Sequence, residues 1–244
     1  MWTWLHKLGS PQRFYSLSGR LIPWFAVLSV LLMAAGLYGG LVLAPPDYQQ
    51  GDSYRIIYIH VPAAWMSMFV YVSMAFAAAV GMIWRIKVAD MVARASAPLG
   101  ASFTFLALVT GSLWGKPMWG AWWVWDARLT SELLLLFLYI GFMALQSAFD
   151  DRRTAARAGA VLALVGLVNI PIIHYSVEWW NTLHQGPTVT KFDAPSIHLS
   201  MLIPLLLMAF GFMCYHAAMV LVRARNELIE WERNSRWLQN LITE

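Results

Sequence analysis

Six long apolar stretches, separated by short polar segments, set the pattern of this chain. They cover approximately residues 21–43, 56–84, 98–114, 129–149, 158–173 and 197–222. A helix needs about 20 apolar residues to cross the hydrocarbon core of a bilayer. Lipid offers no partners to backbone N–H and C=O groups, so segments of this length cross it as helices. The pattern predicts an all-α integral membrane protein, with residues 1–244 forming a single six-transmembrane-helix bundle.

The Lys and Arg residues predict how the six spans are oriented. Thirteen of the 17 lie in the N-terminal segment, the second and fourth connections and the tail after the sixth span. The first, third and fifth connections share the other four. Cytoplasmic segments carry the excess of Lys and Arg. Both termini are therefore predicted to be cytoplasmic, with residues 223–244 as a cytoplasmic tail that forms a surface helix. The odd-numbered connections would face outward, which in a bacterium is the periplasm.

Composition supports the same class of protein. Of the 244 residues, 59% are hydrophobic and 12% are charged, whereas a soluble domain has about 25% charged residues. The formal charge of +4 comes from basic residues scattered between the spans, so it indicates contact with the lipid bilayer and no nucleic acid. The one cysteine, Cys214, lies in an apolar stretch, which excludes an internal disulfide and a Cys-rich zinc site.

A Trp-rich segment, WGKPMWGAWWVWDARLT at residues 114–130, joins the third and fourth spans on the predicted outer side. Lone tryptophans at a membrane interface are typically anchors, and we interpret seven others in that way: Trp2, Trp4, Trp24, Trp65, Trp84, Trp231 and Trp237. This density is too high for anchoring alone. A short helix beginning near Met118 or Gly120 would place part of the segment on one aromatic stripe, facing a planar ligand. Its five tryptophans are Trp114, Trp119, Trp122, Trp123 and Trp125.

Histidines gather on the same predicted side. Of the six, only His6 and the inner His216 fall toward the cytoplasm; the others are His60, His174, His184 and His198. Each of these, taken alone, is typical of an interfacial side chain satisfied by water or a neighbouring loop. Imidazole suits iron, and haem is often held by histidine. Two histidines from separate outer connections, with the Trp-rich segment between them, are therefore candidates to bind an iron from both sides of a flat ring.

Two of these histidines have informative surroundings. His60 comes just before Pro62, and proline is favoured in the first turn of a helix, so His60 is predicted to precede a rigid helix start. His184 follows Trp180 by four residues, a spacing that one helical turn would place on a single face.

Charged residues follow the tryptophans directly. Asp126, Arg128 and Glu132 form either an ion network that fixes the loop or part of a ligand site. In the second interpretation Arg128, Arg55 or Lys116 binds carboxylates of the ligand, as arginine forks do. Both interpretations stay open at this point.

Other chemistries fit the sequence poorly. It contains no phosphate-binding GxxxxGK[ST] loop, no HExxH metal motif and no GxSxG nucleophile motif. Few ionisable residues lie in the middle of the spans, which argues against an ion-coupled transporter. The chain is accordingly predicted to bind and transfer a ligand rather than to act as an enzyme.

The Trp-rich segment resembles the WWD signature of the haem exporter protein C family of haem-handling membrane proteins. The similarity extends to DYQQGDSYRIIYIHVPAA at residues 47–64 and NIPIIHYSVEWWNTLHQG at residues 169–186. It covers nearly the whole chain and is weaker after about residue 187.

The resemblance implies a protein of the bacterial inner membrane that binds haem b non-covalently at the periplasmic face. The ring would lie over the Trp-rich segment, including Asp126 and Arg128, and His60 and His184 would be the axial iron ligands. Delivery to a periplasmic haem chaperone for c-type cytochrome biogenesis is implied. The implied complex also contains a small single-span membrane subunit and ABC-type transporter subunits.

Two other functions are considered. A haem-containing membrane electron-transfer subunit usually places histidine pairs within its spans at two depths, whereas the candidates here cluster on one side. A scaffold whose Trp-rich segment only docks partners would bind no haem.

Overall fold

The computed structural model describes residues 9–184, 186, 189, 191 and 193–243, and these residues form a bundle of helices. Six helical segments within them are long and apolar enough to cross a membrane, as the apolar pattern predicts. The helices are α2 (Pro11–Tyr38) with its π-helical extension η1 (Gly39–Leu43), the 3-10 helix η2 (Asp52–Ile56), α3 (Ile57–Trp84), α4 (Lys87–Trp119), α5 (Ala127–Ala148), α6 (Arg152–Gly166), α7 (Asn169–Trp179), α8 (Leu199–Glu232) and α9 (Arg236–Thr243).

Several helices run further than the apolar stretches that predict them. α4 begins at Lys87 rather than near residue 98, and α8 continues to Glu232, so half of the predicted tail is an extension of the sixth span. The fifth span consists of α6 and α7 and includes His174, which the sequence placed in a loop. Helices can continue beyond the lipid because the polar residues at their ends lie in water. The end of a helix is set by capping residues, which satisfy its unpaired backbone groups, and not by the end of the apolar stretch.

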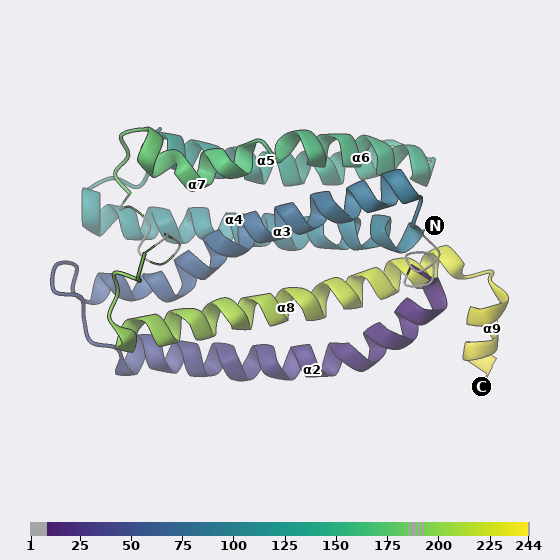
Figure 1. Ribbon diagram of the computed structural model, residues 1–244, viewed down its shortest axis with the longest axis horizontal. Coiled ribbons are helices and arrows are strands. Elements are labelled where there is room, and N and C mark those ends of the chain that lie inside the picture. The colour runs from purple at the N-terminus through teal and green to yellow at the C-terminus, as the bar shows by residue number, and fades with distance from the viewer. Residues whose placement is uncertain (1–8, 185, 187–188, 190, 192, 244) are drawn as a thin grey trace.

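All the long helices run along the long axis of the bundle (Figure 1). The most extensive pairings are α3 with α4 and α2 with α8, and α5 lies against α4, α6 and α7. The start of α2 and the end of α8 lie at one end of the bundle, while α4 ends and α5 begins at the other. The Trp-rich segment therefore lies at the end opposite to the start of α2 and the end of α8, as expected for a segment between the third and fourth of six spans.

A buried polar cluster lies in the bundle beneath the Trp-rich end. The Tyr139 hydroxyl donates to the Ser67 carbonyl oxygen at 2.8 Å, and the Ser67 hydroxyl donates to Glu132 Oε1 at 2.7 Å. Gly100 on α4 leaves the space that the Tyr139 ring fills, because a Cβ atom there would overlap the ring. The close approach of α4 and α5 at this level depends on that glycine, and it sets the distance between the helices that line the site above.

Candidate functional site

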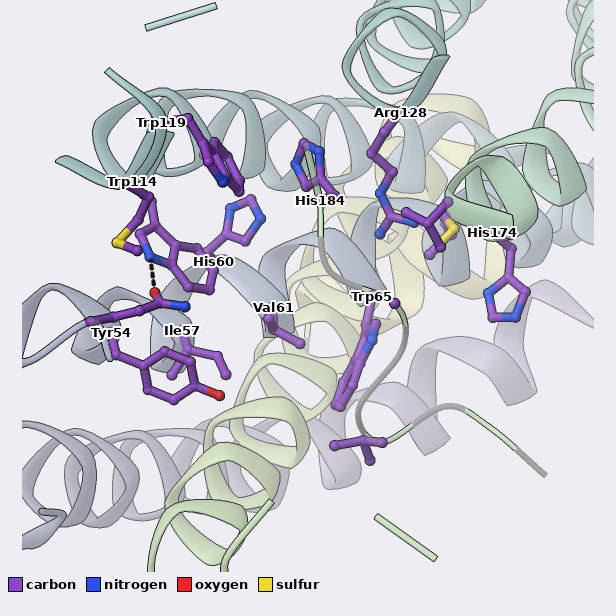
Figure 2. A pocket seen from close by; sticks show the side chains of 17 residues that line it. Tyr54, Ile57, His60, Val61, Trp65, Trp114, Trp119, Arg128, His174 and His184 are labelled. Carbon is purple, nitrogen blue, oxygen red and sulfur yellow. Dashed lines mark hydrogen bonds between the residues drawn. The ribbon is translucent and has the colours of Figure 1, made fainter. Parts of the chain in front are cut away.

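A pocket lies at the Trp-rich end of the bundle, between α3, α4, α5, α7 and the connection after α7 (Figure 2), and its empty space of about 1100 Å³ includes its opening to solvent. Both predicted iron ligands, two of the five tryptophans and one predicted carboxylate-binding arginine line it: His60, His184, Trp114, Trp119 and Arg128. Ligand pockets are typically lined by apolar and aromatic side chains, with a few polar groups that fix the orientation of the ligand. This lining has that character, which suits a flat aromatic ring with polar substituents.

The prediction that His60 precedes a helix start is wrong: α3 begins at Ile57, so His60 lies within its first turn and Pro62 lies inside the helix. The surroundings of His60 fix which ring nitrogen carries the proton. His60 Nδ1 is 3.0 Å from Thr110 Oγ1. The Thr110 hydroxyl donates its single hydrogen to the Leu106 carbonyl oxygen at 2.7 Å, so towards His60 it can only accept. Nδ1 therefore carries the proton, and Nε2 keeps a lone pair. A histidine that binds a metal is typically oriented by such a hydrogen bond.

His184 comes from the connection after α7 and packs against Trp119, with ring centroids 5.2 Å apart. Its Nδ1 faces Asp126 Oδ2 at 3.5 Å, and among the described residues neither buried atom has a hydrogen-bond partner. The other carboxylate oxygen of Asp126 accepts the Leu129 N–H at 2.8 Å and caps α5. The cap holds the carboxylate in place, so Asp126 is positioned to accept from His184 Nδ1 and to leave Nε2 free.

Burial is the main cause that lowers the pKa of His184 below the usual value for histidine. The positive charge of Arg128 lowers this pKa further, while Asp126 acts in the opposite direction. At neutral pH the His184 imidazole is consequently uncharged, and an uncharged imidazole is the form that binds a metal.

The five tryptophans lie in three different places. Trp114 and Trp119 end α4 and line the pocket, and Trp114 Nε1 donates to Gln50 Oε1 at 2.9 Å (Figure 2). Trp122 and Trp123 lie behind Trp119, around a smaller pocket. Trp125 is 75% exposed and borders an apolar groove on the outer side of α4 and α5. The segment therefore forms one wall of a cavity and not a flat surface.

The predicted short helix in the Trp-rich segment is wrong. Helix α4 ends at Trp119 because Gly120 adopts a left-handed conformation with φ 75°, and no helix forms before Asp126. The helical turn predicted for residues 180–184 is also wrong, because α7 ends at Trp179 and Trp180 is extended and exposed. His184 meets a tryptophan nonetheless, but this is Trp119 from a different part of the chain.

The predicted basic residues differ in position. Arg128 lines the pocket, and its Nη1 donates to the Ile173 carbonyl oxygen at 2.9 Å. Arg55 binds Asp52 and a backbone carbonyl, and Lys116 donates to the Gly120 carbonyl oxygen, so both brace loops outside this pocket.

The predicted ion network also has a different form. Among the described residues, Asp126 Oδ2 faces the His184 ring at 3.5 Å, and Arg128 interacts with Asp126 and Glu132 only through their charges, without a contact within 4 Å. Glu132 is buried below the pocket, where it accepts from Ser67.

Some pocket residues escaped the sequence analysis. Trp65, interpreted as an interface anchor, lines the pocket together with Ile57, Val61 and Met68. These positions follow helical spacing on one face of α3, a signal that could have identified Trp65. Gln50 and Thr110 gave no such signal, because each acts on a residue more than 45 positions away.

Comparison with known proteins gives consistent matches. The family model described as heme exporter protein C matches residues 4–239. The chain is 56% identical to heme exporter protein C of Escherichia coli (strain K12) over 242 residues, 99% of this chain and 98% of the relative. It is 53% identical to heme exporter protein C of Haemophilus influenzae, with the same coverage. A putative cytochrome c biosynthesis ccmC-like mitochondrial protein of Marchantia polymorpha is 46% identical over 74% of this chain and 76% of its own length.

Proposed function

Because the chain belongs to the heme exporter protein C family, we propose that it binds haem in the pocket beside Trp114 and Trp119 and passes it to a periplasmic haem chaperone. Membership implies haem transport for cytochrome c maturation, as one subunit of an exporter complex and in a role of transfer rather than catalysis. Its six spans and bacterial relatives make the chain a protein of the inner membrane. The observation that carries the proposal is that His60 and His184 line the same pocket.

In this proposal the haem iron lies between His60 and His184, and Nε2 of each ring is the ligand atom. The Thr110 contact of His60 and the Asp126 contact of His184 both favour protonation of Nδ1, which matches this arrangement. Haem b would be held without a covalent bond, since the one cysteine, Cys214, lies on α8 and outside the pocket lining.

Other pocket residues would hold the rest of the ring. Stacking of the porphyrin on Trp114 or Trp119 would contribute about 0.5–1.5 kcal/mol per pair beyond the burial of area. Arg128 is the candidate for a propionate, because charge-assisted hydrogen bonds between arginine and carboxylate are strong. Trp122, Trp123 and Trp125 would support the wall from behind or contact lipid and partners rather than haem.

The excess of Lys and Arg in the other connections supports a periplasmic position for this end of the bundle. The proposed partners are the haem chaperone on that side and, in the membrane, a small single-span subunit and ABC-type transporter subunits. The electron-transfer alternative has weaker support. His216, buried in the middle of α8, packs against Phe69 and has no second histidine beside it among the described residues.

Haem transfer tests the proposed function. The purified chain, loaded with haem in detergent, is mixed with the purified periplasmic haem chaperone, and the two are then separated and their haem spectra recorded. We expect haem to leave the chain and appear on the chaperone faster than the chaperone takes up free haem at the same concentration. Equal rates from free haem, or haem retained by the chain, would contradict delivery.

Asp126→Asn is expected to weaken haem binding by about 10–100-fold, because the carboxylate that orients a ligating histidine is lost. Asparagine is as good an N-cap as aspartate, so α5 should remain capped. Titration of the purified variant with haem measures the affinity, and thermal unfolding shows that the fold is kept. Removal of the negative charge should also raise the midpoint potential of the bound iron.

The matched control for this substitution is Asp193→Asn, an exposed residue in the connection after α7. It removes the same charge without a contact to His184, so haem affinity and potential should be unchanged. If Asp126→Asn behaves like this control, Asp126 only caps α5.

A further inference from the structure

A second cavity, of about 840 Å³, lies at the opposite end of the bundle from the haem pocket. It forms where α3 ends, α4 and α6 begin and α8 ends. Its lining carries five cationic side chains and two carboxylates: Arg85, Lys87, Arg152, Arg153, Arg157, Asp90 and Asp151. The start of α2 and the end of α8 lie at this end as well, so the Lys and Arg distribution places it at the cytoplasmic surface.

Two of the five cations, Arg85 and Arg157, form no ion pair or hydrogen bond in the part of the chain that the structure describes, and both side chains are exposed. Arg153 is also exposed and forms no ion pair within 4 Å among these residues, but its charge acts on both Asp90 and Asp151. Lys87 is 3.5 Å from Glu232, and the Arg152 guanidinium lies 5.3 Å from the centre of the Trp231 ring. The cavity thus offers several donors without an acceptor.

The two carboxylates do not neutralise this charge. Asp151 caps α6, where its Oδ2 accepts from the N–H and the hydroxyl of Thr154 at 2.8 and 2.6 Å. The Asp90 carboxylate lies against Gly81, where a Cβ atom would overlap it. Even when Glu232 beside Lys87 is counted, five cations face three carboxylates, which leaves an excess of positive charge at the cavity.

Arg85 gives an independent reason to regard the cavity as a built site. It ends α3 in the left-handed conformation, with φ 56° and ψ 38°. Glycine is the usual residue at this position of a helix end, and a non-glycine residue there costs of order 1–3 kcal/mol. Cytoplasmic segments of membrane proteins carry an excess of basic residues, and this accounts for the number of cations at the cavity. It does not account for an arginine held in the left-handed conformation at the rim of the cavity.

We propose that this cavity binds a phosphate group, and specifically the headgroup of an anionic phospholipid in the cytoplasmic leaflet. Arginine binds phosphate oxygens through paired N–H donors. Basic pockets between membrane helices on the cytoplasmic side are suited to anionic headgroups. Met82 and Trp231 supply an apolar part of the lining, which suits a headgroup that remains attached to its acyl chains better than a free ion.

The test uses the full-length chain and two double variants. Arg153→Gln with Arg157→Gln removes two cations of the cavity. Arg13→Gln with Arg20→Gln removes two exposed cations of α2 on the same side of the membrane that do not line the cavity. Native mass spectrometry then measures the retention of phosphatidylglycerol and of phosphatidylcholine by each protein.

We expect the wild type and the α2 variant to retain phosphatidylglycerol over phosphatidylcholine, and the cavity variant to bind it about tenfold or more weakly. Unchanged haem binding in both variants would show that the fold is intact. Equal retention of phosphatidylglycerol by all three proteins would overturn the proposal.

A second arm separates the two sources of phosphate. Inorganic phosphate and glycerol phosphate are added as competitors at millimolar concentration. We expect neither to displace the lipid. If phosphatidylglycerol does not bind but inorganic phosphate stabilises the wild type and not the cavity variant, the ligand is a soluble phosphate and the lipid assignment is wrong.

Discussion

His60→Ala and His184→Ala are each expected to lower the haem content of the purified protein about tenfold or more. Each substitution removes one of the two proposed axial ligands, and the remaining histidine alone must then hold the iron. Trp114 and Trp119 remain in both variants, so any haem retained by stacking should show an altered spectrum. The measurement is the haem-to-protein ratio after purification, determined from the absorbance of the pyridine haemochrome.

His174→Ala is the control for this pair. His174 lines the same pocket, but in the view of Figure 2 it lies on the far side of Arg128 from His60. Its ring packs against Tyr175, with ring centroids 4.7 Å apart. We expect this variant to keep nearly all of its haem. If His174→Ala lost as much haem as His184→Ala, haem content would respond to any change in the pocket lining. The loss in His184→Ala would then be no evidence that His184 binds the iron.

Gly100→Ala is expected to destabilise the protein by about 1–3 kcal/mol and to lower its thermal midpoint by several degrees. The added Cβ atom would overlap the Tyr139 ring, which is fully buried and hydrogen-bonded to the Ser67 carbonyl oxygen. The ring cannot move away without loss of its packing or of this hydrogen bond. Thermal unfolding of the detergent-solubilised protein, followed by loss of soluble monomer, measures the change.

Gly141→Ala is the matched control within α5. Its Cβ atom would meet only the end of the Leu162 side chain, at 3.2 Å. Alanine is favoured over glycine in a helix by about 1 kcal/mol, so this variant should be as stable as the wild type or more so. Equal midpoints for the two variants would show that the contact between α4 and α5 is not as tight as the structure has it.

The six spans were predictable because each depends on one property of a continuous stretch, its apolarity. Helix ends were less predictable. Gly120 ends α4 and Asp126 caps α5, and these local conformations, rather than the spacing of the tryptophans, exclude a helix between them. The spacing of Trp119, Trp122 and Trp123 fits a helix, but the left-handed glycine between them separates the first from the other two.

The candidate site was predictable in its residue types and not in its contacts. The sequence placed His60, His184 and the Trp-rich segment on one side of the membrane, and in the structure the two histidines border one pocket together with Trp114 and Trp119 of that segment. The contacts of His60 with Thr110 and of Trp114 with Gln50 join residues far apart in the chain. No periodicity carries such information, because it arises only when helices from different parts of the chain pack together.

The most direct measurement of the proposed ligation is the low-temperature EPR spectrum of ferric haem bound to the purified chain. We expect a low-spin signal from two imidazole ligands in the wild type and its conversion to a high-spin signal in His60→Gly and in His184→Gly at saturating haem. Added imidazole should restore the low-spin signal in both variants, by occupying the space of the missing side chain. A low-spin signal that persists unchanged in either glycine variant, without imidazole, would contradict the assignment of that histidine as an iron ligand.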